Sequence, residues 1–236
     1  MKWFIGLALI GQVFFISLSV ADINPTVHSV PIERAFFIQG FDDTDVAQVV
    51  IKGVFPSTCY QMGPTDLWVN HRENRIEIKQ LAYLYEGNCL RVAVPYHQTI
   101  EVGVLSASSY EVVDTKEERT LGKLVISRTP EGGVGTDDYL YAPLQDAYIS
   151  GLRRSPYLTL RGTFANSCIK FKDVKIGFKN EVLIVQPIVE KKDGSFCKDG
   201  SYPFTKRVKL KQKFKKEFLL HARSMNGQAI NKVYTP

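Results

Sequence analysis

A run of cations near the C-terminal end offers the clearest chemistry in this sequence. Residues 207–215 read RVKLKQKFK, so a cation stands at every odd position, while Val208, Leu210 and Phe214 hold even ones. Side chains of a β-strand alternate between its two faces, so the five cations would line one side over about 26 Å. Such a row could bind a repeating polyanion. The candidate anion-binding residues, called the basic run below, are Arg207, Lys209, Lys211, Lys213 and Lys215.

Cations of an earlier segment could widen this row. Lys170 and Lys172 alternate with apolar residues, and Lys175 and Lys179 would join them if a β-bulge shifts the alternation by one residue near Asp173. All these cations would then form one basic sheet face. The alternative is that the lysines only solvate an outer face or protect an edge strand from aggregation.

Catalytic motifs are missing from the sequence. There is no HExxH motif, and no two of the histidines stand at metal-ligand spacing: His28, His71, His97 and His221. The sequence also has no GxSxG nucleophile motif and no phosphate-binding loop. A hydrolase with a site built from loops is the less favoured alternative, because no carboxylate pair stands out for acid–base catalysis. We expect a non-catalytic protein without a cofactor.

One acidic cluster could hold a hard cation. The segment GFDDTD places Asp42, Asp43 and Asp45 within four residues, and carboxylate oxygens are ligands that calcium prefers. The spacing is not that of an EF-hand, and the matching segment later in the chain, GLRRSP, has Arg153 and Arg154 instead. A solvated turn is the alternative to a calcium site.

The N-terminus has the pattern of a secretory signal peptide. Lys2 precedes an apolar run that ends in the small residues Ser19, Val20 and Ala21, the positions that a signal peptidase reads. Residues 1–21 would be removed by cleavage after Ala21. An uncleaved membrane anchor is the alternative, but polar residues interrupt the run, and no later stretch is apolar enough to span a membrane. We expect a secreted or periplasmic protein.

The four cysteines favour disulfide bonds, because an exported chain folds in an oxidising compartment. KGVFPSTCY at 52–60 returns as RGTFANSCI at 161–169, so the chain repeats itself. Cys59 to Cys89 is a separation of 30 residues and Cys168 to Cys197 one of 29, and each interval falls inside one copy. We therefore predict these two bonds, one in each copy. A zinc site is disfavoured, since no two cysteines form a CxxC pair.

The repeat sets the domain organisation. Each copy is about 109 residues long, from 168 minus 59, which suits one antiparallel sandwich. Apolar and polar residues alternate with period two in segments such as RIEIK, and Asn226-Gly227 is a strong hairpin signal. We predict an all-β chain with two tandem β-sandwich domains, 22–133 and 134–236, divided near Gly133.

The architecture of a signal peptide followed by two such repeats, each with one short-range disulfide, resembles the tandem immunoglobulin-like domains of many uncharacterised bacterial secreted proteins. The resemblance covers most of the mature chain and involves no function-bearing motif. It implies that the domains bind, space or scaffold.

The two halves carry opposite charge. Residues 22–150 contain 10 Lys and Arg against 18 Asp and Glu, whereas residues 151–236 contain 19 against 6. We expect a binding or scaffold protein whose basic second domain contacts an anionic envelope polymer or lipid surface. Self-association, with the acidic domain docked on a neighbour's basic domain, is the alternative. Nucleic acid ranks last, because its sites interleave aromatic side chains with cations, and the exposed positions of the basic run have none.

Overall fold

The protein is an all-β structure of two tandem β-sandwich domains, as the sequence predicts. A computed structural model describes residues 24–130, 139–192 and 196–236. Within these ranges the chain forms fifteen strands and one short 3-10 turn, η1 (Met225–Gly227). The predicted signal peptide (1–21) and the predicted division at Gly133 lie outside the described residues.

The first domain packs a five-stranded sheet against a three-stranded one. The larger sheet contains β1 (Thr26–Ser29), β4 (Tyr60–Asn70), β5 (Arg75–Leu84), β7 (Ser108–Asp114) and β8 (Arg119–Ile126). The smaller sheet contains β2 (Arg34–Phe37), β3 (Val46–Phe55) and β6 (Val94–Val104). Strand β5 is central, since it pairs antiparallel with β4 and β1 and parallel with β7. Fully buried side chains of both sheets, such as Ile51 and Ile78, form the core between them.

The second domain repeats the pairing of the first, except that β1 has no counterpart strand among the described residues. Its four-stranded sheet contains β11 (Ile169–Lys179), β12 (Val182–Lys191), β14 (Phe218–Arg223) and β15 (Ala229–Tyr234). Its three-stranded sheet has the order β13 (Asp199–Lys209), β10 (Tyr157–Asn166) and β9 (Leu144–Ser150). The β12–β14 pair is parallel, like β5–β7. The predicted hairpin joins β14 to β15, and Asn226 and Gly227 have the positive φ of 60° and 70° that this signal implies.

Both predicted disulfides are present at matching places. The Cα atoms of Cys59 and Cys89 are 5.4 Å apart, and those of Cys168 and Cys197 are 5.3 Å apart. In the first domain the bond joins the turn after β3 to the segment before β6. In the second domain it joins the turn after β10 to the segment before β13. Each bond thus closes a loop of about 30 residues, which stabilises its domain by about 3 to 4 kcal/mol in the chain-entropy model.

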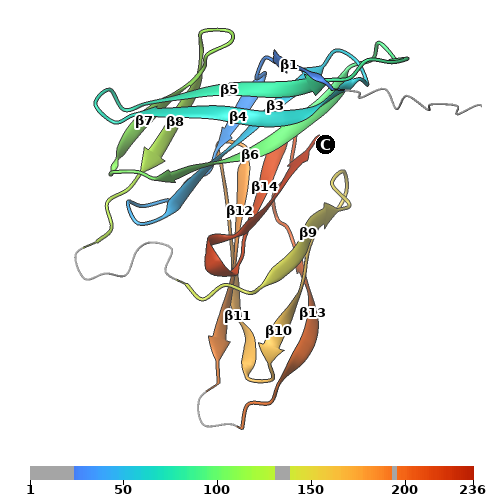
Figure 1. The fold of residues 1–236 in the computed structure, drawn as a ribbon. Coiled ribbons are helices and arrows are strands. Elements are labelled where there is room, and N and C mark those ends of the chain that lie inside the picture. The colour runs from blue at the N-terminus through green and yellow to red at the C-terminus, as the bar shows by residue number, and fades with distance from the viewer. Residues whose placement is uncertain (1–23, 131–138, 193–195) are drawn as a thin grey trace, which may run out of the picture.

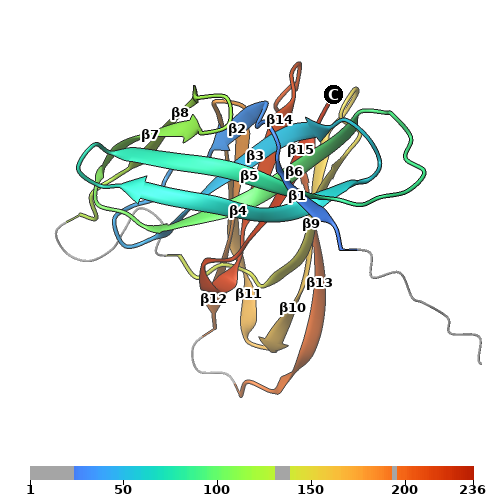
Figure 2. The same cartoon turned by 45° about the horizontal axis from the view of Figure 1, so that its top comes forward.

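The two domains share a core. Figures 1 and 2 show the strands of the first domain lying across one end of the second domain, where β12 and β14 meet it. Val182 and Leu219, both fully buried, belong to the second domain but pack within the apolar core of the first. Ile184 and Val233 pack against the same cluster from its margin. The interface is therefore apolar at its centre, which holds the domains in one arrangement.

Ion pairs lie beside this apolar contact. Their cations come from the acidic first domain and their carboxylates from the basic second domain. Arg34 of the acidic first domain lies 2.6 Å from Glu181 and 3.7 Å from Glu217 of the basic second domain. Lys52 also pairs with Glu217. These ion pairs join the domains within one chain, whereas the predicted docking of an acidic domain on a basic one is a contact between two molecules.

Candidate functional site

The basic run lies at the end of β13 and in the irregular segment that follows. All five of its cations are exposed, whereas Leu210 and Phe214 are buried in the second core, as the alternation predicts. The prediction of one straight strand is wrong, because β13 ends at Lys209. Its partner β10 begins at Tyr157, opposite Lys209, and the pairing ends just beyond with a hydrogen bond of 2.9 Å from the Leu210 amide to the Pro156 carbonyl oxygen. Only Arg207 and Lys209 stand on a strand.

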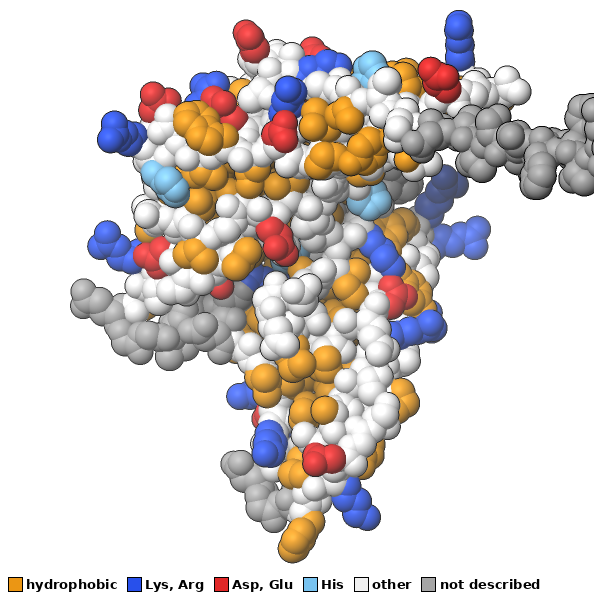
Figure 3. Space-filling view, viewed as in Figure 1, with side chains coloured by type: hydrophobic (Ala, Val, Ile, Leu, Met, Phe, Trp, Pro, Cys, Tyr) orange, Lys and Arg blue, Asp and Glu red, His pale blue; other side chains and the backbone are white. Residues whose placement is uncertain are grey.

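The predicted single basic sheet face is also wrong. The β-bulge near Asp173 is present, between Phe171 and Asp173. However, β11 and β13 are edge strands of two different sheets. They lie on the same side of the sandwich, since Phe171 meets the ring of Phe204 at 5.0 Å and the Lys206 ammonium at 5.9 Å. The cations therefore line one edge of the domain, and Figure 3 shows Lys and Arg side chains projecting near β13.

Aromatic rings lie among these cations, contrary to the expectation from the run alone. The strand register puts Arg207 opposite Thr159, which in turn is opposite Tyr148 of β9. Tyr157, which pairs with Lys209, and Arg161 share this outer face, because Leu158 and Leu160 point into the core. We call this set the Arg–Tyr face: Tyr148, Tyr157, Arg161, Arg207 and Lys209.

Each arginine of the Arg–Tyr face makes a cation–π contact with a tyrosine ring. The Arg207 guanidinium lies 4.5 Å from the centre of the Tyr157 ring, and that of Arg161 lies 5.3 Å from the Tyr148 ring. Such cation–π contact orients the planar guanidinium while leaving its N–H groups to bind an anion. Among the described residues, no carboxylate forms an ion pair with any cation of the basic run. The sequence missed this face because its rings come from β9 and β10.

The acidic cluster is a hydrogen-bonded turn. Asp42 accepts bonds from the amide and hydroxyl of Thr44, and Asp45 accepts one from the Asp42 amide. The hydroxyl and amide of Thr129 donate to Asp43 at 2.6 and 2.8 Å, which holds the pKa of that carboxyl below its usual range. Within the described ranges, no three His, Cys, Asp or Glu side chains are grouped so as to hold a metal ion.

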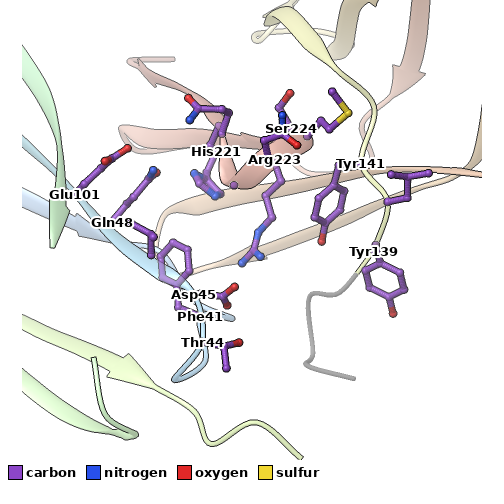
Figure 4. Close-up of a pocket in the computed structure, with 17 residues that line it drawn as sticks. Phe41, Thr44, Asp45, Gln48, Glu101, Tyr139, Tyr141, His221, Arg223 and Ser224 are labelled. Carbon is purple, nitrogen blue, oxygen red and sulfur yellow. The ribbon is translucent and has the colours of Figure 1, made fainter. Parts of the chain in front are cut away.

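A pocket of about 500 Å³ opens where the domains meet (Figure 4). The first domain contributes Gln48 from β3 and Phe41 from the turn before it; the second contributes His221 and Arg223 from β14 and the turn that follows. The sequence did not predict this pocket, because its residues are far apart in the chain, although Asp45 of the acidic cluster and the Asn226-Gly227 turn both lie in its wall.

The two basic groups of the pocket are buried. His221 is 1% exposed and lies 2.8 Å from the Asn231 amide oxygen through Nδ1. Burial lowers the pKa of His221 to about 4, so the ring is neutral near pH 7. Burial also lowers the pKa of Arg223, to about 10, against the opposing effect of Asp45 and Asp42. The Arg223 guanidinium therefore stays charged, 5.3 Å from the ring of Phe41.

His221 predicts a specific loss of stability in acid. Its folded pKa of about 4 lies below its usual value of 6.5, so the unfolded chain binds the proton first as the pH falls. The free energy of unfolding should drop by about 1.4 kcal/mol per pH unit between these values. Urea unfolding measured over this pH range should show that the free energy of unfolding falls less steeply with decreasing pH in His221→Gln than in the wild type. The exposed His28→Gln variant should keep the wild-type slope, and equal slopes for all three proteins would contradict the prediction.

Comparison of the chain with protein-family models, with curated proteins and with solved structures gives no match. In the part of the chain that the structure describes, no helix has the length and apolarity that a membrane span requires.

Proposed function

We propose that this chain is an exported, non-catalytic binding protein whose second domain attaches to an anionic polymer or lipid surface through the Arg–Tyr face and the basic run. Two disulfides suit an oxidising compartment outside the cytoplasm. The signal-peptide pattern of residues 1–21 supports the same compartment.

The observation that carries this proposal is the contrast between two sets of cations. Arg34 and Lys52 at the domain interface are neutralised by glutamates. The basic run has no such carboxylate among the described residues, yet its backbone is held firmly by the buried Leu210 and Phe214. Phe214 stacks on Phe218 at 4.0 Å. Concentrated, unpaired charge of one sign on an anchored segment attracts anions and raises their rate of association.

The anionic groups that fit best are phosphates or sulfates carried at repeated intervals. Guanidinium N–H groups bind such oxygens in pairs, and the exposed lysines of segment 211–216 add point charges beside them. A surface of this kind can be a lipid bilayer with anionic headgroups or an envelope polymer. Each cation near an anionic membrane contributes about 1 kcal/mol.

Vesicle sedimentation tests the proposal. The protein without residues 1–21 would be mixed with vesicles of phosphatidylcholine, alone or with phosphatidylglycerol, and with insoluble cell-envelope material, over a range of salt. We expect binding only to the anionic samples, and binding that weakens as salt rises. Replacing all five cations of the basic run by serine should weaken it by between three and four orders of magnitude, about 4,000-fold.

A matched variant controls for net charge. It carries serine at five exposed cations of the first domain, Arg72, Lys79, Arg91, Lys116 and Lys123. It should bind like the wild type. If both variants lose binding equally, net charge rather than the basic run would account for the binding. If the wild type does not bind, the proposal is refuted. Light scattering on the same samples would then reveal whether the protein instead associates with itself.

A further inference from the structure

The pocket between the domains contains a buried polar group that lacks a partner. Gln48 lies on β3 with 5% of its surface exposed, and its Oε1 atom accepts no hydrogen bond from any described residue. A buried amide oxygen without a donor is unfavourable, because it has lost its hydrogen bonds to water. Gln48 lines the pocket, as Figure 4 shows. A ligand that donates an O–H or N–H group there would remove this cost.

The charges around the pocket oppose one another. Arg223 supplies one cation, Asp45 and Glu101 supply carboxylates, and His221 is neutral near pH 7. An anionic ligand would meet the carboxylates, and a cationic ligand would meet the guanidinium. An uncharged ligand rich in hydrogen-bonding groups avoids both costs, since burying a charge without a partner is expensive.

Aromatic rings form the apolar part of the wall. Phe41 lies beneath Arg223, and Tyr141 and Tyr139 stand on the opposite side in Figure 4. The two tyrosine rings meet edge to face at 6.2 Å. A flat ring accommodates the apolar C–H face of a cyclic polyol, while the polar groups around it meet the hydroxyls. A volume of about 500 Å³ falls within the usual range for small ligands, about 300 to 1,000 Å³.

We propose that this pocket binds a neutral saccharide of one or two rings, with a hydroxyl donating to Gln48 Oε1 and a ring face packed on the aromatic wall. The site needs both domains, because β3 supplies Gln48 and β14 supplies Arg223. Ligand-binding sites commonly occur at such domain boundaries. The proposal does not depend on the anion-binding face, which is on other strands.

Saturation-transfer NMR tests this with defined probes: glucose, galactose, mannose, N-acetylglucosamine and their β-linked disaccharides, with glucuronate and glucosamine as charged comparisons. We expect transfer to at least one neutral sugar and little to its charged counterpart. Absence of transfer to every neutral sugar would overturn the proposal. The serine variant of the basic run should keep the signal, which separates this site from the anion-binding function.

Gln48→Met decides whether the amide is the recognition group. Methionine keeps the side-chain length and removes the unpaired oxygen, so the variant should unfold at the same temperature or higher and lose at least tenfold in sugar affinity. Gln98→Met is the matched control, because Gln98 Oε1 on β6 also lacks a partner but does not line the pocket. It should keep full affinity. Unchanged binding by Gln48→Met would refute the role of the amide.

A second variant tests the proposal even if Gln48→Met fails to fold. Ala229 lies at the pocket at the start of β15 and is only partly buried, so Ala229→Trp can fill the pocket with little disturbance of the core. It should abolish sugar binding with little change in unfolding temperature. Retained binding would place the sugar elsewhere and overturn the proposal.

Discussion

Leu219→Ala should destabilise both domains at once, by about 2 to 5 kcal/mol. Leu219 is fully buried and extends from β14 of the second domain into the core of the first. Truncation would leave a cavity within the buried cluster that Leu219 shares with side chains of the first domain, and would remove apolar surface that both domains bury. The first domain should then open more readily, although the substitution is outside its own strands.

Leu220→Ala is the matched control. Leu220 is the next residue on the same strand, equally buried, but its side chain belongs to the core of the second domain. Amide hydrogen exchange followed by mass spectrometry distinguishes the two effects strand by strand. Leu219→Ala should speed exchange in β3 and β6 as well as in β12 and β14, whereas Leu220→Ala should act mainly on the second domain. Unaltered exchange in β3 and β6 of Leu219→Ala would show that the domains are energetically independent.

Gly162→Ala should cost about 3 kcal/mol or more. A methyl group at Gly162 would collide with the carbonyl oxygen of Pro143 and would lie 2.6 Å from the Phe204 ring. The oxygen belongs to the backbone, so it cannot turn aside as a side chain would. A methyl group at Gly53 would likewise lie 2.7 Å from the Pro31 carbonyl oxygen, which explains why both copies of the repeated motif contain this glycine.

A different glycine provides the control for this prediction. Gly177 lies in β11 with open space where a methyl group would go, so Gly177→Ala should leave stability unchanged or raise it slightly. Thermal unfolding monitored by circular dichroism would compare the two variants with the wild type. Similar melting temperatures for Gly162→Ala and Gly177→Ala would contradict the argument from the close approach.

Local patterns of the sequence were sufficient for the elements of this fold. The repeat of KGVFPSTCY as RGTFANSCI predicted two copies of one domain and both cysteine pairs. Alternation in segment 207–215 predicted which side chains are exposed, and Asn226-Gly227 predicted the last hairpin. The alternation of side chains and the turn conformation are set by neighbouring residues. The cysteine pairs follow from the repeat itself, because each spacing falls inside one copy.

Strand register decided which side chains the cations contact. The sequence shows Arg207 beside Val208, but the ring beneath its guanidinium is Tyr157, fifty residues earlier. That contact exists because β10 pairs with β13 in one register, and no local pattern encodes the register. The sequence likewise could not place Lys175 and Arg207 on different sheets, since both lie on strands with the same alternation.

The domain interface and its pocket were decided by tertiary structure alone. β14 reads FLLHAR, a short apolar run that indicates a buried strand without telling what buries each face. Leu220 faces its own core, and Leu219 and His221 face the other domain or the pocket beside it. The sequence by itself therefore determined two sandwiches, each closed by one internal disulfide, and an exposed row of cations. Only the packing of one sandwich on the other buries Leu219 and Gln48, because burial there requires surfaces that are far apart in the chain.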